Sequence, residues 1–506
     1  MTLRRLTGAC ALALALAAGT EAQDLASFEK RITVKKLDNG LTLIVCERPL
    51  APVFSFFTHV NVGGAQEVPG ITGLAHMFEH MAFKGTDSIG TTDYAAETAA
   101  LAKVEAAYLA YDAARRRPTG RDEKDVAAKE KAFKDAMAEA DRYVVKNQFG
   151  EIIDREGGVG LNAFTNSDET GYFYSFPANR LELWAYLESE RFLKPVFREF
   201  YKERDVVMEE RRMRTESQPI GKLVEQFLAT AFAAHPYQQP VVGHMSDLQA
   251  FSATDADAFY KKHYVPSNMV VSVVGDVKTA GVVSLVEKYF GRIKPGPEPE
   301  ALRTEEPKQF AEKEVVLVDP AQPCYVEGYH KPAATHPDDA IYDAIGDILS
   351  NGRVSRLYRS LVRDKKIAAA AAGFNGFPGQ KYPNMFVFYA VPLPGKTTGE
   401  VKDAIRAEIE RLKTEDVGDV ELQMVKTRAK ASLVRGLGDN SGLAQQLGSY
   451  QALYGDWREL FRAVERIDKV TKADVRRVAN QVFVPSNRTV GRIETKPAAP
   501  ATEKQS

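Results

Sequence analysis

The feature that most constrains the fold is an internal repeat. The tetrapeptide Val-Pro-Ser-Asn occurs at residues 265–268 and again 219 residues later, at 484–487. Upstream of each copy, Ser252 and Thr471 each precede an Asp by three residues, which is the spacing of a capping box at a helix start. An apolar, β-like run follows each copy. A repeated helix start, turn and strand predict two homologous α/β domains, hence an α+β fold in which helices pack on antiparallel-rich sheets.

The composition along the chain predicts where these domains begin and end. Residues 291–312 are rich in Pro and Glu without apolar periodicity, which is typical of a linker. The linker separates a first domain, 24–290, from a second, 313–494. Residues 97–145 are rich in Ala, Glu, Lys and Arg with apolar residues at helical spacing, and predict a helical hairpin inserted in the first domain. Residues 495–506 predict a disordered tail.

Residues 1–22 have the layout of a secretory signal. Arg4 and Arg5 precede an uncharged apolar stretch at 6–19, and small residues follow at a predicted cleavage site before Gln23. The apolar stretch is shorter than the ~18 residues that a membrane span needs, and no later segment is longer and equally apolar. We therefore expect an exported, periplasmic protein without a transmembrane segment. A cytosolic chain with an apolar N-terminus is the alternative.

Charge and cysteine content exclude several classes of function. Lys and Arg number 67 against 68 Asp and Glu, so the chain lacks the basic excess expected for binding nucleic acid. After signal cleavage only Cys46 and Cys324 remain, each within a β-like run, and no Cys-x-x-Cys pair exists. This excludes a thiolate zinc site. We expect both cysteines to be buried and unpaired, with a disulfide in an oxidising compartment as the alternative.

One short segment carries a metal-binding pattern. His76 and His80 lie four positions apart and Glu79 lies between them, so all three share one face of a helix. Two imidazoles one turn apart can bind Zn²⁺ at about 2.0–2.1 Å each, and a carboxylate beside them can take a proton from the activated water. The chain has only eight histidines, which favours a metal site over two incidental histidines on a helix.

A hydrolytic zinc site also needs a third protein ligand and an open position for water. Glu203 and Glu210 lie seven residues apart in a helix-like acidic run, and therefore on nearly the same face. Composition alone would equally allow a solvated charged helix.

Seven short segments together resemble the pitrilysin/insulinase family of zinc peptidases, in its bacterial two-domain branch related to mitochondrial processing peptidase. They cover nearly the whole mature chain in the expected order. They are GLAHMFEHMAFKGT (73–86), NAFT (162–165) with ETGY (169–172), ERDVVMEE (203–210), HPY (235–237), SRLY (355–358) and LVR (361–363).

The resemblance implies a role for each matching residue. His76, His80 and Glu210 would bind one Zn²⁺ per chain, with Glu209 as the rival third ligand in the neighbouring register. Glu79 would be the general base and Glu203 would orient a ligand. The inserted hairpin accounts for a longer spacing between the second His and the third ligand than the family has. Three residues match the edge strand on which the family lays the substrate backbone, namely Asn162, Ala163 and Phe164.

One position departs from the family. Arg363 matches an Arg of the second domain that contacts the substrate, but the Tyr expected seven residues later is Ala370. A tyrosine hydroxyl there would help to stabilise the developing oxyanion. We therefore expect a heterodimer in which a homologous subunit supplies the donor. A homodimer that tolerates the loss is the alternative.

The resemblance implies a zinc metalloendopeptidase that hydrolyses short or unfolded peptides. A non-catalytic structural or assembly subunit is the second hypothesis, because some relatives have become such subunits. The sequence leaves open the peptide specificity, membrane association and the choice among zinc, manganese and cobalt.

Overall fold

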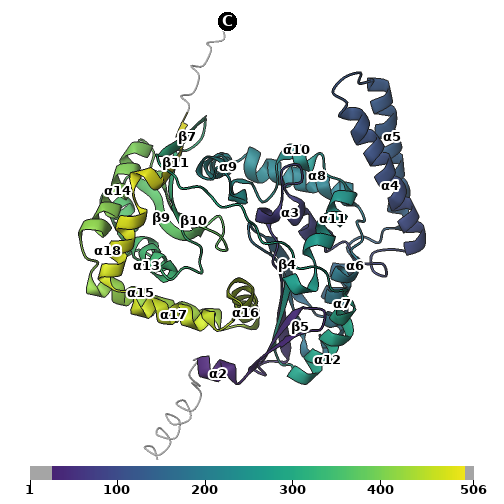
Figure 1. Cartoon of the computed structure of the whole chain (residues 1–506), viewed down its shortest axis with the longest axis horizontal. Coiled ribbons are helices and arrows are strands. Elements are labelled where there is room, and N and C mark those ends of the chain that lie inside the picture. The colour runs from purple at the N-terminus through teal and green to yellow at the C-terminus, as the bar shows by residue number, and fades with distance from the viewer. Residues whose placement is uncertain (1–24, 496–506) are drawn as a thin grey trace, which may run out of the picture.

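The computed structural model describes residues 25–495, which form two α/β halves that face each other (Figure 1). The predicted α+β fold class is confirmed, because each half contains one mainly antiparallel sheet packed by helices. The predicted signal segment lies outside the described residues, as does the predicted tail except for Thr495, which is the last residue of β11.

The first sheet has the strand order β1-β2-β6-β3-β5-β4. Its neighbours are antiparallel except for β2 and β6, which are parallel. All residues of the central strand β6 are buried, whereas β4 forms one edge. The strands are β1 Ile32–Lys36, β2 Thr42–Glu47, β3 Val53–Val60, β4 Val159–Thr165, β5 Thr170–Pro177 and β6 Met269–Gly275.

The second sheet repeats this plan with one strand fewer, in the order β7-β11-β8-β10-β9. Here β7 and β11 are the parallel pair, and β9 is the edge strand that corresponds to β4. The strands are β7 Lys313–Asp319, β8 Cys324–Lys331, β9 Ala368–Phe377, β10 Asn384–Pro392 and β11 Arg488–Thr495.

The repeated tetrapeptide has the same role in both halves. It follows α11 (Ala253–His263) in the first half and α18 (Lys472–Val482) in the second, and each helix begins with a capping box. The Asn that ends each copy ties the turn to its helix: Asn268 Nδ2 donates to His263 O at 2.8 Å, and Asn487 Nδ2 donates to Val482 O at 3.0 Å. These hydrogen bonds satisfy carbonyls at the helix ends. This shared role explains in structural terms why the tetrapeptide occurs in both halves.

One helix from each half packs on the sheet of the other half. α9 (Pro219–Ala231) packs on β7 and β11, while α16 (Asn440–Tyr454) packs on β3 and β6. A Cβ at Gly448 would lie 2.8 Å from Phe57 Cδ1, so glycine permits the close approach of α16 to the first sheet. The predicted domain ranges therefore each contain the strands of one sheet, apart from Thr495 at the end of β11, but not all of its covering helices. The boundaries themselves stay a prediction.

The remaining helices include the predicted insert. α4 (Tyr94–Arg115) and α5 (Glu123–Ala140) form a long hairpin that projects from the first half (Figure 1). It corresponds to the insert predicted at 97–145. The other helices are α2 Leu25–Glu29, α3 Leu74–Met81, α6 Gln148–Arg155, α7 Leu181–Leu193, α8 Phe200–Arg211, α10 Met245–Leu248, α12 Thr279–Tyr289, α13 Asp339–Ser350, α14 Thr398–Thr414, α15 Asp419–Gly436 and α17 Glu459–Lys469.

Two expectations about the mature chain can be compared with this fold. Cys46 and Cys324 are both buried and free, as expected for unpaired strand cysteines. Within residues 25–495, no helix combines the length and the apolarity that crossing a bilayer would require.

Candidate metal centre

The helix α3 that carries both predicted histidine ligands is anchored at its N-terminal end by Glu67. This buried carboxylate accepts hydrogen bonds from Gly73 N and Ala75 N, both at 2.7 Å. It thereby satisfies N–H groups that a helix start leaves unpaired, while burial raises the pKa of this carboxyl to about 8. Gly73 has a φ of 93°, and a Cβ there would lie 2.7 Å from Val242 O, so glycine fits this entry.

The structure brings together His76 and His80 on α3 with Glu210 on α8. One potential ligand atom from each lies within 4.8 Å of the others. Glu210 faces both imidazoles, with Oε1 3.7 Å from His76 Nε2 and Oε2 3.6 Å from His80 Nε2. Two imidazole nitrogens and a carboxylate oxygen form a donor set that suits Zn²⁺ and leaves a fourth position for water. The residues present therefore fit a hydrolytic zinc site.

Glu203 fixes the orientation of His80. Its Oε1 lies 3.0 Å from His80 Nδ1, and its Oε2 pairs with Lys84 Nζ at 2.5 Å. A proton on Nδ1 that is donated to Glu203 leaves Nε2 free to bind a metal. Burial opposes ionisation of Glu203, but the hydrogen bonds from His80 and Lys84 outweigh it and lower its pKa. Its charged form therefore persists beside the site.

His76 is held as a neutral imidazole. Burial, followed by the neighbouring charges of His80 and Arg214, lowers its pKa to about 3. A neutral ring has the free lone pair that metal binding needs.

The predicted general base, Glu79, lies on the same helix but is not part of the ligand cluster. Burial raises the pKa of Glu79 above its ordinary value, although the hydrogen bond from Thr165 opposes the shift. The Thr165 hydroxyl donates to Glu79 Oε2 at 2.6 Å. A carboxylate with a raised pKa is better suited to accept and return a proton near neutral pH.

The packing of α8 distinguishes the two registers that the sequence left open. The Glu210 side chain is 13% exposed and faces α3. In contrast, the Glu209 side chain is 57% exposed and pairs with Arg212 at 2.9 Å. The geometry therefore favours Glu210 as the third ligand.

Arg214 is a site residue that the sequence reasoning missed. It lies in the π-helical turn η4 (Arg212–Glu216), and its Nη1 is 2.5 Å from Glu210 Oε1. Its side chain is 76% exposed, so the guanidinium is open to solvent beside the cluster. The four-residue spacing from Glu210 was the available signal, since acidic and basic residues at that spacing meet on a helix.

The predicted substrate-binding residues fall in two places. Asn162, Ala163 and Phe164 lie on the edge strand β4, whose last residue, Thr165, contacts Glu79. Arg363 lies in the second half, in η8 (Tyr358–Asp364), where its exposed guanidinium pairs with Asp364 at 2.6 Å. Ala370 occupies the edge strand β9. The substrate contacts of these residues stay a prediction.

Family models and known proteins match both halves of the chain. A model described as "Insulinase (Peptidase family M16)" matches residues 48–114, and one described as "Peptidase M16 inactive domain" matches residues 250–429. The chain is 30% identical to zinc protease PqqE of Helicobacter pylori over 497 residues, covering 96% of this chain and 98% of that protein.

Two further similarities support the same comparison. A probable mitochondrial-processing peptidase subunit beta of Arabidopsis thaliana is 23% identical over 483 residues, covering 93% of this chain and 79% of that protein. The crystal structure of a protease from Helicobacter pylori matches with a TM-score of 0.77 and 28% identity, covering 92% of this chain and 99% of that one.

Proposed function

The chain belongs to the insulinase family, peptidase family M16, and on this premise we propose that it is a zinc metalloendopeptidase acting on short or unfolded peptides. The observation that carries the proposal is the convergence of His76, His80 and Glu210 with Glu79 beside them. A site that only stored a metal would not need a half-buried carboxylate of raised pKa next to its ligands.

In the proposed reaction, water adds across the peptide bond. One bound zinc per chain would polarise the scissile carbonyl and lower the pKa of the attacking water. Glu79 accepts a proton from this water at a carboxylate oxygen while the hydroxyl joins the carbonyl carbon. It then returns the proton to the leaving nitrogen, so the base is regenerated. Glu203 keeps His80 in the required tautomer, and Thr165 positions Glu79.

The edge strand β4 supports the proposed peptide specificity. An edge strand offers unpaired backbone groups to an extended chain, whereas a folded protein rarely presents such a segment. Asn162, Ala163 and Phe164 would pair with the substrate, and the strand leads directly to Glu79 through Thr165.

The absence of a tyrosine at Ala370 supports assembly with a homologous chain. In this proposal the chain is the metal-bearing subunit of a heterodimer, and the partner supplies the missing hydroxyl donor near the site, where Arg363 would also contact the substrate. A homodimer is the alternative. The sequence of residues 1–22 supports export to the periplasm.

The test uses the purified mature chain and a quenched fluorescent peptide, with the chain alone and mixed with a homologous chain. Zinc-dependent cleavage that Glu79→Gln abolishes, while the bound metal is retained, would support the peptidase. Cleavage by the mixture alone would support the heterodimer, and full activity of the chain alone would remove the need for a partner's donor.

Two matched variants test the assignment of the third ligand. Glu210→Gln should lose zinc, measured by metal analysis after dialysis, whereas Glu209→Gln one position away should retain it. Stoichiometric zinc without cleavage in any mixture would favour the second candidate function, a structural or assembly subunit. The missing tyrosine at Ala370 is the observation that supports this second candidate.

A further inference from the structure

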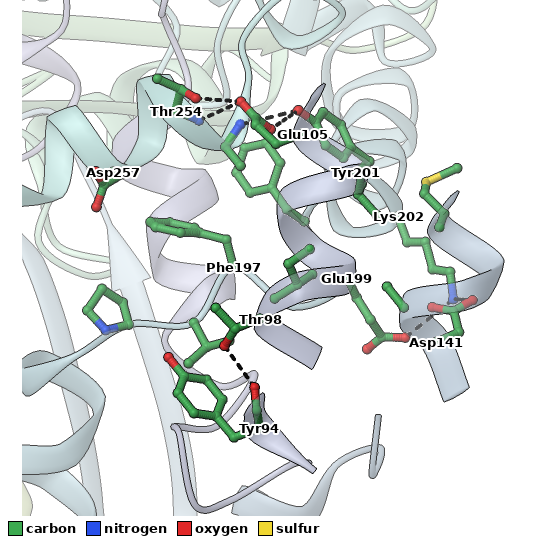
Figure 2. Close-up of a pocket in the computed structure, with 18 residues that line it drawn as sticks. Tyr94, Thr98, Glu105, Asp141, Phe197, Glu199, Tyr201, Lys202, Thr254 and Asp257 are labelled. Carbon is green, nitrogen blue, oxygen red and sulfur yellow. Dashed lines mark hydrogen bonds and ion pairs between the residues drawn. The ribbon is translucent and has the colours of Figure 1, made fainter. Parts of the chain in front are cut away.

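A cavity of about 310 Å³ lies where the helical insert meets the N-terminal end of α8 (Figure 2). This volume is at the lower end of the ~300–1,000 Å³ that small-molecule sites occupy. Its walls are largely apolar, and Phe197 lies in the middle of the side chains that line it. The apolar lining includes Leu101, Val104, Met137, Val196, Phe197 and Phe200.

The charged groups of the cavity are mainly negative. Four carboxylates line it, and Lys202 is the one basic residue among the described lining residues. Lys202 Nζ is already engaged, at 2.6 Å from Asp141 and 3.6 Å from Glu199. The four carboxylates belong to Glu105, Asp141, Glu199 and Asp257.

Glu105 differs from the other three because only neutral groups hold it. Its Oε2 accepts from the Tyr201 hydroxyl at 2.6 Å, and its Oε1 accepts from Thr254 N at 3.0 Å and Thr254 Oγ1 at 2.6 Å. Among residues 25–495, no basic side chain forms an ion pair with it. Three donors thus fix the direction of an ionised carboxylate without neutralising its charge. Figure 2 shows this group at one side of the cavity, next to Thr254 and Tyr201.

We propose that this cavity binds a small organic ammonium ion, whose apolar group fills the space around Phe197 and whose ammonium pairs with Glu105. The apolar walls disfavour a hydrated inorganic cation, and the excess of carboxylates disfavours an anion. A neutral apolar molecule would leave the Glu105 charge without a partner. This site shares no residue with the metal cluster, so the inference does not depend on peptidase activity.

The test is calorimetric titration of the full mature chain with 2-phenylethylammonium, and with 2-phenylethanol as the neutral counterpart. We expect saturable binding of one ammonium ion per chain, and an affinity for the alcohol that is at least about tenfold lower, because a charge-assisted hydrogen bond is lost. Glu105→Gln keeps the shape of the side chain and should weaken ammonium binding by at least about tenfold.

Two further variants make the result specific. Glu130→Gln removes a carboxylate of α5 that pairs with Lys134 and does not line the cavity, so binding should be unchanged. Thr98→Trp places a large ring in the cavity from an exposed position on α4 and should abolish binding without altering the buried core. If Glu105→Gln fails to fold, as judged by its melting curve, Thr98→Trp decides.

Several results would overturn the proposal. These are no saturable binding of 2-phenylethylammonium, equal affinity for amine and alcohol, or undiminished binding by folded Glu105→Gln or folded Thr98→Trp.

Discussion

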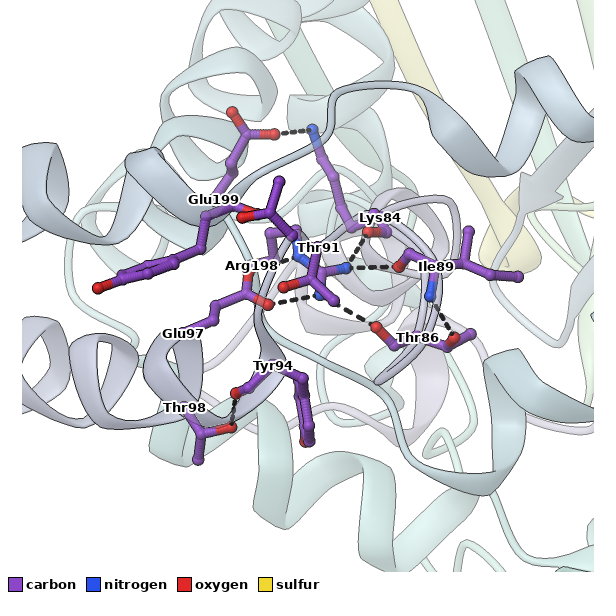
Figure 3. Close-up of polar contacts among 12 residues, drawn as sticks. Lys84, Thr86, Ile89, Thr91, Tyr94, Glu97, Thr98, Arg198 and Glu199 are labelled. Atoms are coloured by element: carbon purple, nitrogen blue, oxygen red, sulfur yellow. Dashed lines mark hydrogen bonds and ion pairs between the residues drawn. The ribbon is translucent and has the colours of Figure 1, made fainter.

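A buried ion pair between the insert and the metal-binding region offers the sharpest test of the structure (Figure 3). Arg198 Nε and Nη2 donate to the two oxygens of Glu97 at 2.6 and 2.7 Å, and the side chains are 1% and 0% exposed. The same guanidinium donates to three backbone carbonyls of the segment that follows α3, at Lys84 (2.7 Å), Thr86 (3.0 Å) and Ile89 (3.1 Å).

The expected cost of Arg198→Ala follows from these contacts. The substitution leaves the Glu97 charge buried without a cation, and breaking a buried pair in this way costs about 3–5 kcal/mol. We therefore expect the free energy of unfolding to fall by about that amount. Replacing both residues by Met should cost less than Arg198→Ala, because no buried charge is then left alone, although the three backbone carbonyls lose their donor in both variants.

The same substitution should also weaken the metal site. Arg198 holds the backbone of Lys84, whose ammonium pairs with Glu203, which in turn orients His80. Without Arg198, the segment that follows α3 loses these backbone hydrogen bonds and no longer holds Lys84 in place against Glu203. We expect weaker zinc binding by Arg198→Ala in a competition assay with a chromophoric chelator.

Urea unfolding in the presence of a chelator measures the stability effect separately from metal binding. The control is Lys103→Met, which breaks an exposed pair with Glu139 (2.8 Å) and should cost at most about 1 kcal/mol. A loss below about 1 kcal/mol for Arg198→Ala, or a double Met variant as unstable as the single Ala variant, would refute the reasoning.

Three further predictions concern protonation and charge. Thr165→Val removes a hydrogen bond that lowers the pKa of Glu79, so the acid limb of the kcat/KM profile should move to higher pH; an unmoved limb would contradict the role of Glu79. Burial lowers the pKa of His235 and His263 from 6.5 to about 4, so the folded chain keeps both neutral. The free energy of unfolding therefore keeps their full contribution above pH 6.5 and loses it as the pH falls through about 4, at up to about 1.4 kcal/mol per pH unit for each histidine. His263→Phe should remove the part of this pH dependence that belongs to His263, measured by urea unfolding at a series of pH values. Arg214→Gln removes a positive charge beside the cluster and should tighten zinc binding by roughly two- to fivefold, measured by chelator competition; unchanged or weaker binding would contradict the electrostatic argument.

The sequence predicted those features that local patterns determine. The capping boxes at Ser252 and Thr471 begin the expected helices, and a strand follows each repeated turn. The hairpin insert has the expected helices because its composition and periodicity favour them over a span of many residues. Each of these signals involves residues close together in the chain.

The sequence limited the third metal ligand to Glu210 or Glu209 but did not decide between them. A spacing of seven residues places Glu210 near the face of Glu203, but only the packing of α8 against α3 turns Glu209 outward. Contacts between distant segments were also beyond local patterns. Glu97 and Arg198 are 101 residues apart, and no short-range signal indicates that either would be buried.

The exchange of helices between the halves has the same cause. The apolar faces of α9 and α16 predict that each helix packs on a sheet, but not on which sheet, because both sheets offer an apolar surface. The exchange depends on glycines where the elements touch. Gly448 of α16 leaves room for the Phe57 ring, and Gly491 of β11 faces Leu223 and Phe227 of α9.

The turn that joins β4 and β5 connects the second half to the metal centre. Its Asp168 accepts hydrogen bonds from the backbone N–H groups of Gln380 (2.6 Å) and Lys381 (3.0 Å), which lie between β9 and β10. Three residues before Asp168, Thr165 holds Glu79. The second half supplies none of the clustered ligand atoms, yet it fixes the end of the strand that positions the proposed base. A half without metal ligands can therefore still influence the chemistry, because the strand that would bind the substrate and orient Glu79 is anchored on it.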